Sequence, residues 1–180
     1  VDGIQRLFIQ PNKSLLLIDG NGSALHLNPT PFYSNNFQET VGPEWSNTKT
    51  SRTPRGDRFL GVFGRETVSL TLNLLPTHTS VNVGFDLFIL GSWDGNSLYH
   101  GPDIWELSVD KGPTILKTTF SAWGFFSQAY PGTYPGGNYP TGTGAFEVNT
   151  LGYGQDSVYR LSFDIPHSAS SLTLNFSSQT

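Results

Sequence analysis

The fourteen acidic residues are the first side chains to consider for chemistry, because glycoside hydrolysis needs two carboxyl groups that face each other across a cleft. Their spacing singles out no such pair. Glu106, for example, lies in an alternating segment on the face opposite to Trp105. The four histidines are far apart and lack the spacing of a zinc site, and the sequence contains no Gly-x-Ser-x-Gly elbow. We therefore expect a protein that is not an enzyme.

One expected loop contains residues whose oxygen atoms suit calcium. Asp94 and Asn96 flank Gly95, and Asp103 follows in the same loop. Calcium prefers several such oxygens in a flexible arrangement. The alternative is that Asp-Gly-Asn is simply a turn, for which these residue types are also favoured. The sequence thus predicts either no cofactor or calcium, with Asp94, Asn96 and Asp103 as the candidate ligands.

Aromatic residues make up 13% of the chain, and several fall in segments rich in Gly and Pro. Trp105 alternates in phase with Leu107 and Val109, which predicts that it belongs to the core. The others fall in expected loops, where an exposed aromatic cluster indicates a binding surface. The alternative is that the loop at 130–140 lies across the sandwich and covers the edges of its core. The candidate ligand-binding residues are Trp93, Trp123, Tyr130, Tyr134 and Tyr139.

The composition argues against several classes of partner. Charged residues make up only 13% of the chain, and the net charge is −4 without any basic run, so we expect no nucleic-acid partner. The uncharged polar surface suits hydrogen bonding to sugars or to neighbouring subunits. No apolar run approaches the roughly 20 residues needed to span a bilayer, so we expect no membrane span. The chain lacks Met and begins at Val1, which indicates processing and predicts an extracellular or cell-surface protein.

Apolar and polar residues alternate with a period of two in many short segments, which is the pattern of half-buried β-strands. Segment 81–90 has one apolar face throughout and a second face that turns apolar at its end. We expect an all-β, two-sheet antiparallel β-sandwich of the jelly-roll or lectin-like kind, in which the connections 28–57 and 121–156 cross between the sheets. The expected strands lie at 4–10, 14–18, 24–27, 58–63, 67–72, 81–90, 104–109, 114–120, 158–165 and 171–176.

The N-terminal segment is expected to stand apart from the main body. Residues 1–28 contain two or three apolar strands with an Asp-Gly-Asn-Gly hairpin turn at 19–22, and a polar stretch rich in Asn, Thr and Pro follows them. We assign an N-terminal strand arm to 1–28 and the β-sandwich domain to 29–180. The apolar strands of the arm must be covered by their own sandwich or by a neighbouring subunit.

From about residue 41 to residue 176, the chain resembles an unnamed lectin-like β-sandwich domain of bacterial secreted and surface proteins. This resemblance covers about three quarters of the chain. It implies ligand binding only by analogy of fold. The segments that carry it are 56–64, 85–96 (FDLFILGSWDGN), 101–105, 149–153, 156–161 and 166–168.

The chain departs from that family at its ends. Such domains continue with a Trp-Gly-x-Asp-Asn segment and a closing apolar strand, which this sequence lacks, whereas its first residues look like that closing strand. A sandwich without this strand has an unpaired edge. The N-terminal strand would fill the gap in its own chain or in the next subunit, which resembles donor-strand exchange in bacterial pili and biofilm fibres. The candidate inter-subunit residues are Ile4, Leu7, Phe8 and Ile9.

Two functions follow from these expectations. The first is a non-enzymatic structural subunit that self-assembles by strand exchange into an extracellular filament, pilus or matrix, with itself as partner in a homopolymer. The alternative is a carbohydrate-binding, lectin-like module that takes a polysaccharide or glycan, with or without calcium.

Overall fold

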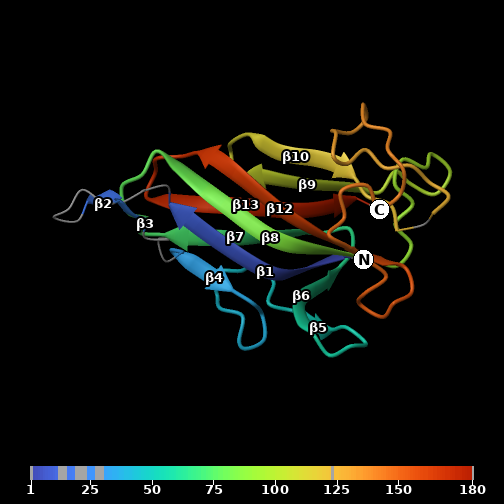
Figure 1. Ribbon diagram of the computed structural model, residues 1–180, viewed down its shortest axis with the longest axis horizontal. Coiled ribbons are helices and arrows are strands. Elements are labelled where there is room, and N and C mark those ends of the chain that lie inside the picture. Colours follow the sequence, from blue (N-terminus) through green and yellow to red (C-terminus); the bar gives the residue numbers. More distant parts are fainter. Residues whose placement is uncertain (1, 12–15, 19–23, 27–30, 123, 180) are drawn as a thin grey trace.

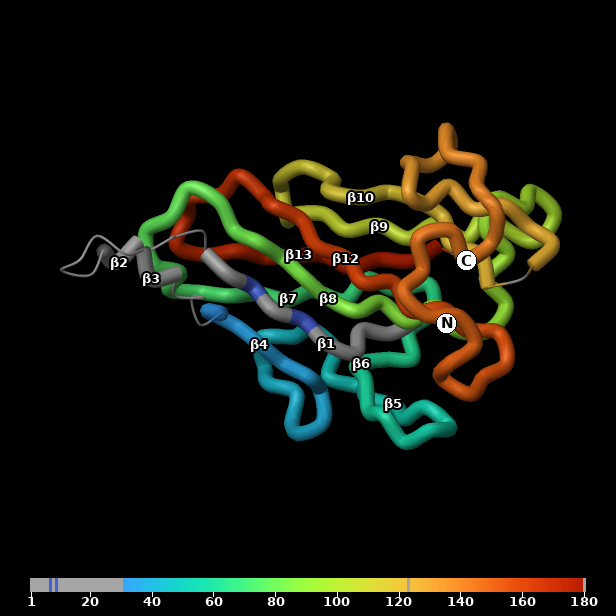
Figure 2. The backbone as a smooth tube through the Cα atoms, viewed as in Figure 1, coloured from blue at the N-terminus to red at the C-terminus, as the bar shows by residue number. Residues whose placement is uncertain are grey.

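The computed structural model describes residues 2–11, 16–18, 24–26, 31–122 and 124–179, and it confirms an all-β sandwich of two antiparallel sheets (Figures 1 and 2). No helix occurs in these ranges, so none of their segments is a helix that could cross a membrane. Each of the ten segments expected to form a strand overlaps a strand of the structure.

The larger sheet has seven strands in the order β11-β12-β8-β1-β6-β5, and β4 also pairs with β1. β8 pairs with the whole of β1 along one edge, whereas β6 and β4 share the other edge. The strands of this sheet are β1 (Asp2–Pro11), β4 (Tyr33–Asn35), β5 (Thr50–Arg52), β6 (Arg58–Phe63), β8 (Ser80–Leu90), β11 (Glu147–Val148) and β12 (Asp156–Pro166).

The smaller sheet has four strands in the order β10-β9-β13-β7. A further pair, β2 and β3, forms a two-stranded sheet of its own, and the hairpin turn predicted at 19–22 lies outside the described residues. The bounds of these six strands are β2 (Leu16–Ile18), β3 (Ala24–His26), β7 (Thr67–Asn73), β9 (Ile104–Val109), β10 (Thr114–Thr119) and β13 (Ser171–Gln179).

The core lies between the two sheets and follows directly from the period-two alternation along the strands. Val83, Phe85 and Leu87 of β8 meet Trp105 and Leu107 of β9 in one buried cluster. The ring centroids of Phe85 and Trp105 are 5.8 Å apart. The prediction that Trp105 is a core residue is therefore confirmed.

The outer face of the larger sheet carries a second, smaller apolar cluster. Phe88 and Leu90 of β8 pack there with Phe59 of β6, Val158 of β12 and Leu151 from the connection before β12. This cluster explains why the second face of segment 81–90 turns apolar at its end, as the alternation predicted.

The connection 121–156 crosses between the sheets, as expected. The prediction is wrong for 28–57, because its strands β4 and β5, and β6 after it, all belong to the larger sheet. The segment between β4 and β5 reaches the smaller sheet at Trp45, whose backbone bridges to Leu70 of β7. Residues 121–156 lead from β10 in the smaller sheet to β11 and β12 in the larger one. Sequence reasoning missed β4, β5 and β11, because strands of two or three residues are too short to show alternation.

The long connection after β10 is held by a buried glutamine. Gln128 is fully buried, and its Oε1 accepts hydrogen bonds from the hydroxyl of Tyr159 at 3.0 Å and from the backbone N–H of Gly142 at 3.1 Å. Its Nε2 donates to the backbone carbonyls of Tyr130 at 3.0 Å and Thr143 at 2.9 Å. One side chain thus ties together both ends of the Gly/Pro-rich loop and joins it to β12.

A pair of histidines joins two loops that each connect the smaller sheet to the larger one. The Nε2 of His78, before β8, lies 2.7 Å from the Nδ1 of His167, after β12, and the rings are stacked with centroids 5.0 Å apart. The outer nitrogens face backbone carbonyls, with His78 Nδ1 at 2.5 Å from the oxygen of Pro76 and His167 Nε2 at 3.1 Å from that of Ser171. The pair closes the end of the sandwich at which β7 and β12 finish.

β1 occupies an interior position in the larger sheet of its own chain. Leu7 and Ile9 are fully buried in the main core, and Ile4 and Phe8 lie in the same strand. The Cα register pairs Leu7 with Phe85 of β8. Residues 2–11 are therefore part of the sandwich, and a boundary at residue 28 does not separate them from it.

Candidate functional site

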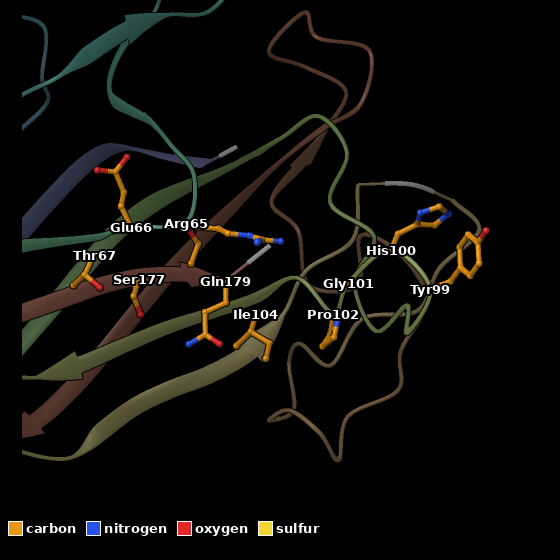
Figure 3. Close-up of a pocket in the computed structure, with 11 residues that line it drawn as sticks. Arg65, Glu66, Thr67, Tyr99, His100, Gly101, Pro102, Ile104, Ser177 and Gln179 are labelled. Atoms are coloured by element: carbon orange, nitrogen blue, oxygen red, sulfur yellow. The ribbon is translucent and has the colours of Figure 1, made fainter.

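A groove of about 700 Å³ opens at one end of the smaller sheet (Figure 3). Strand pairing brings its walls together, because Ser177 of β13 is the register partner of Thr67 in β7, and Gln179 is the partner of Ile104 in β9. The volume falls in the range of small-molecule sites. The lining residues are Arg65, Glu66, Thr67, Tyr99, His100, Gly101, Pro102, Ile104, Ser177, Ser178 and Gln179.

An aromatic rim forms one side of this groove. The Ser97 hydroxyl accepts hydrogen bonds from the backbone N–H groups of Tyr99 at 3.3 Å and His100 at 3.2 Å, and the Gly101 N–H donates to the Ser97 carbonyl at 3.0 Å. This tight turn projects Tyr99 into solvent, where 89% of it is exposed. The Tyr99 and His100 rings meet edge to face at 4.6 Å, and Phe126 lies 6.1 Å beyond His100.

The opposite side of the groove is polar. It is formed by the hydroxyl groups of Thr67 and Ser177 and the amide of Gln179, with Ile104 as an apolar patch between them and the rim (Figure 3). Ser178 is turned inward, and its hydroxyl donates to the backbone carbonyl of Gly64. The groove therefore offers an aromatic face and several hydrogen-bonding groups to one ligand.

The side chains of Arg65 and Glu66, which directly precede β7, point in different directions. Glu66 points away from the aromatic rim and accepts a hydrogen bond from the Asn47 amide at 3.1 Å. Arg65 extends toward the loop that carries His100 (Figure 3). No hydrogen bond or ion pair of Arg65 occurs within the described part of the chain.

The three residues predicted to bind calcium lie on the loop behind this groove, where they hold the loop together. Asp103 is 3% exposed and accepts a hydrogen bond from the backbone N–H of Asp94. Burial raises its pKa, and the nearby Asp94 raises it further, although the backbone bond, the N-terminal amine and Arg65 oppose this. Asn96 accepts from the Thr119 hydroxyl at 2.5 Å and donates to the Gly137 carbonyl at 3.0 Å.

Calcium at this loop stays a prediction. The Asn96 carbonyl oxygen is already used by a protein donor, and the described residues include no group of three or more His, Cys, Asp or Glu that could hold a metal ion.

The aromatic residues predicted to bind a ligand are not gathered on one surface. Trp93 is 1% exposed and belongs to the core, so its assignment to an exposed platform is wrong: a loop position does not prevent burial. The half-buried ring of Tyr130 packs on Phe120 at 5.1 Å and Tyr159 at 5.2 Å, with its pKa raised by burial. Tyr134 is half-buried and Tyr139 is 39% exposed, whereas Trp123 lies outside the described residues.

Sequence reasoning missed the residues that form the groove. Arg65, Tyr99 and Gln179 are far apart in sequence, and only the pairing of β7, β13 and β9 brings their segments together. The one available signal was the Tyr99-His100 pair, which falls outside any alternating segment in a stretch rich in turn residues.

A second hollow of about 740 Å³ lies on the outer face of the larger sheet. Two of its three charged residues pair with each other, because the Arg160 Nε donates to Asp86 Oδ1 at 2.9 Å, and the guanidinium also lies 3.8 Å over the Phe146 ring. The third charged residue is Glu39. This hollow lacks an aromatic rim among its lining residues, which are Ser34, Asn35, Asn36, Glu39, Thr40, Asp86 and Arg160.

No protein-family model, no curated protein and no solved structure matches this chain. Any function of the chain therefore has to be inferred from the groove and from β1.

Proposed function

We propose that the chain is an extracellular, non-enzymatic carbohydrate-binding module, and that the groove beside Tyr99 binds a polysaccharide. The observation that carries the proposal is the 89% exposed Tyr99 ring beside a polar wall. Single exposed aromatic residues are common, but Tyr99 borders a groove, where its apolar ring and polar hydroxyl suit ligand contact.

The chemistry of the groove suits a sugar ring. A pyranose has an apolar C–H face that stacks on an aromatic ring, while its hydroxyl groups need donors and acceptors around the rim. Thr67, Ser177 and Gln179 offer both kinds of group. The groove is open along the end of a sheet, which favours a segment of a longer chain over a small ligand that must be enclosed.

Binding is tested with a panel of immobilised polysaccharides, using the intact protein and two variants from one loop. Tyr99→Ala should weaken binding by about tenfold through loss of stacking. Leu98→Ala is the matched control, because Leu98 is 85% exposed and adjacent but does not line the groove. Unfolding curves of both variants should match the wild type. If no polysaccharide binds, or if Tyr99→Ala binds as well as Leu98→Ala, the proposal is overturned.

A second candidate function, self-assembly by strand exchange, is supported by the position of β1. This strand is the first in the chain, both of its edges are paired, and Leu7 and Ile9 are fully buried. The same backbone pairs would form if β1 of one copy entered the sheet of the next. Such a head-to-tail contact does not close, so it would build a filament.

Cysteine pairs distinguish exchange from pairing within one chain, and the chain has no Cys of its own to interfere. Gln10 and Asn82 are register partners across β1 and β8. A mixture of Gln10→Cys and Asn82→Cys chains should form a disulfide-linked dimer under mild oxidation only if strands exchange. The double variant Gln10→Cys/Asn82→Cys is the control for the register of β1 and β8. It should form the disulfide within one chain if β1 pairs in its own sheet. Absence of the mixed dimer, with a monomeric mass in solution, would exclude assembly by exchange.

A further inference from the structure

The groove contains an arginine, Arg65, whose charge acts on the buried Asp103 but which forms no ion pair within the described residues. The guanidinium of Arg65 is exposed and has no hydrogen bond or ion pair within the described residues. Three other arginines are paired, unlike Arg65 and Arg55: Arg160 pairs with Asp86, and Arg52 donates to the Gly56 carbonyl. Arg58 also donates to backbone carbonyls of the preceding segment.

Two described carboxyl groups, one adjacent in sequence and one that Arg65 acts on electrostatically, form no ion pair with it. Glu66 is the next residue, but its carboxylate is turned toward Asn47. Asp103 is buried behind the groove and accepts its hydrogen bond from the backbone of Asp94. Among the described residues, no carboxylate or carbonyl accepts a hydrogen bond from the guanidinium, which leaves its five N–H donors to an external acceptor there.

Arginine presents its donors in a planar fork, which matches the two oxygens of a carboxylate. A ligand that stacks on Tyr99 and spans the groove would bring its substituents to Arg65, since both residues line the same hollow (Figure 3). The exposed His100 ring adds a second donor on the same side.

We propose that the ligand of this groove is an acidic polysaccharide, whose sugar carboxylates bind to Arg65 while a sugar ring stacks on Tyr99. This inference rests on the proposed carbohydrate-binding function and adds the class of sugar to it.

The test compares polygalacturonate with its fully methyl-esterified form, because these two polymers share one backbone and differ in charge. Wild-type protein should bind the acid form at least about tenfold more tightly, as expected for a charge-assisted hydrogen-bonded contact. Arg65→Gln should bring the ratio of the two affinities close to one. Arg65→Lys should recover only part of it, because a lysine lacks the planar fork.

A control variant separates this site from the effect of total charge. Arg55 is exposed, has no hydrogen bond or ion pair within the described residues, and does not line the groove. Arg55→Gln therefore changes the net charge by the same amount and should keep the preference for the acid form.

Three outcomes would overturn the inference. Equal affinity for the acid and esterified polymers, with Tyr99→Ala still weakening both, would remove the acidic preference and leave the carbohydrate-binding function standing. Equal loss in Arg55→Gln and Arg65→Gln would assign the preference to overall charge. Absence of binding to every polysaccharide would overturn the proposed function together with the inference.

Discussion

The contact between His78 and His167 requires one proton more than two neutral rings carry. Backbone carbonyls only accept hydrogen bonds, so the nitrogens that face Pro76 and Ser171 must both bear hydrogen. The facing nitrogens, 2.7 Å apart, then form a hydrogen bond only when a further proton lies between them. Formation of this hydrogen bond therefore gives the pair a single positive charge.

The energy and pH range of this contact follow from the same geometry. A hydrogen bond that involves a charged group contributes about 1.5–3 kcal/mol, and the half-buried position of His167 favours the lower figure. Burial, and then the charge of His78, lower the pKa of His167, while its bond to Ser171 raises it. His167 therefore binds a proton at a higher pH in the unfolded chain than in the folded protein. As a result, stability is lost as the pH falls below the ordinary histidine value of about 6.5.

Removing either ring isolates the contact. We expect His78→Gln and His167→Gln each to lower the free energy of unfolding by about 1.5 kcal/mol near pH 6.5, with little further loss in the double variant. The difference between wild type and His167→Gln should shrink as the pH falls below the ordinary histidine value of about 6.5, because burial disfavours the charged form of His167 in the folded state.

Urea unfolding followed by tryptophan fluorescence measures these energies, since the chain has four tryptophans. A double-mutant cycle at each pH gives the coupling energy between the rings. A coupling energy below about 0.5 kcal/mol at every pH, or one that does not change with pH, would refute the shared proton.

Other predictions concern the core and its polar anchors. Leu7→Ala should cost about 2–5 kcal/mol of unfolding free energy in urea titrations, whereas Leu98→Ala should cost almost nothing. Gln128→Ala should cost at least about 2 kcal/mol and speed proteolysis within 121–146, because it leaves the Tyr159 hydroxyl and several backbone groups unsatisfied. Burial raises the pKa of Tyr159 to about 12, so ultraviolet titration should show a phenol that ionises later than the ordinary tyrosine value and is lost in Tyr159→Phe. Arg160→Lys should cost only about 0.5–1 kcal/mol, because the Arg160 side chain is 56% exposed and a lysine can still pair with the buried Asp86.

The strands could be predicted because burial on one face of a sheet imposes a period of two on the sequence. β8 shows this most clearly, since Val83, Phe85 and Leu87 face the core while its other face becomes apolar only where Phe88 and Leu90 are covered. The order of the strands could not be predicted, because alternation specifies which face is buried and not which strand is the neighbour. The interior position of β1 is an example: nothing in its residues indicates β8 as its partner.

The candidate site was harder to predict than the fold, for two physical reasons. Arg65, Tyr99 and Gln179 become neighbours only through strand pairing, which leaves no local pattern in the sequence. Trp93 shows the reverse error, because a residue outside a strand can still turn into the core when the loop folds over it. Residue type and loop position indicated that aromatic residues would form a surface, but not which ones.

The interior position of β1 also has a consequence for how the chain acquires its structure. β1 is synthesised before both of its main neighbours, β6 and β8, which follow much later in the sequence. Its pairing requires long loops to close, and sheets built from such distant contacts fold in milliseconds to seconds. Before that pairing forms, β8 and β6 lack their common neighbour, and under the proposed strand exchange the β1 of another copy would compete for this position.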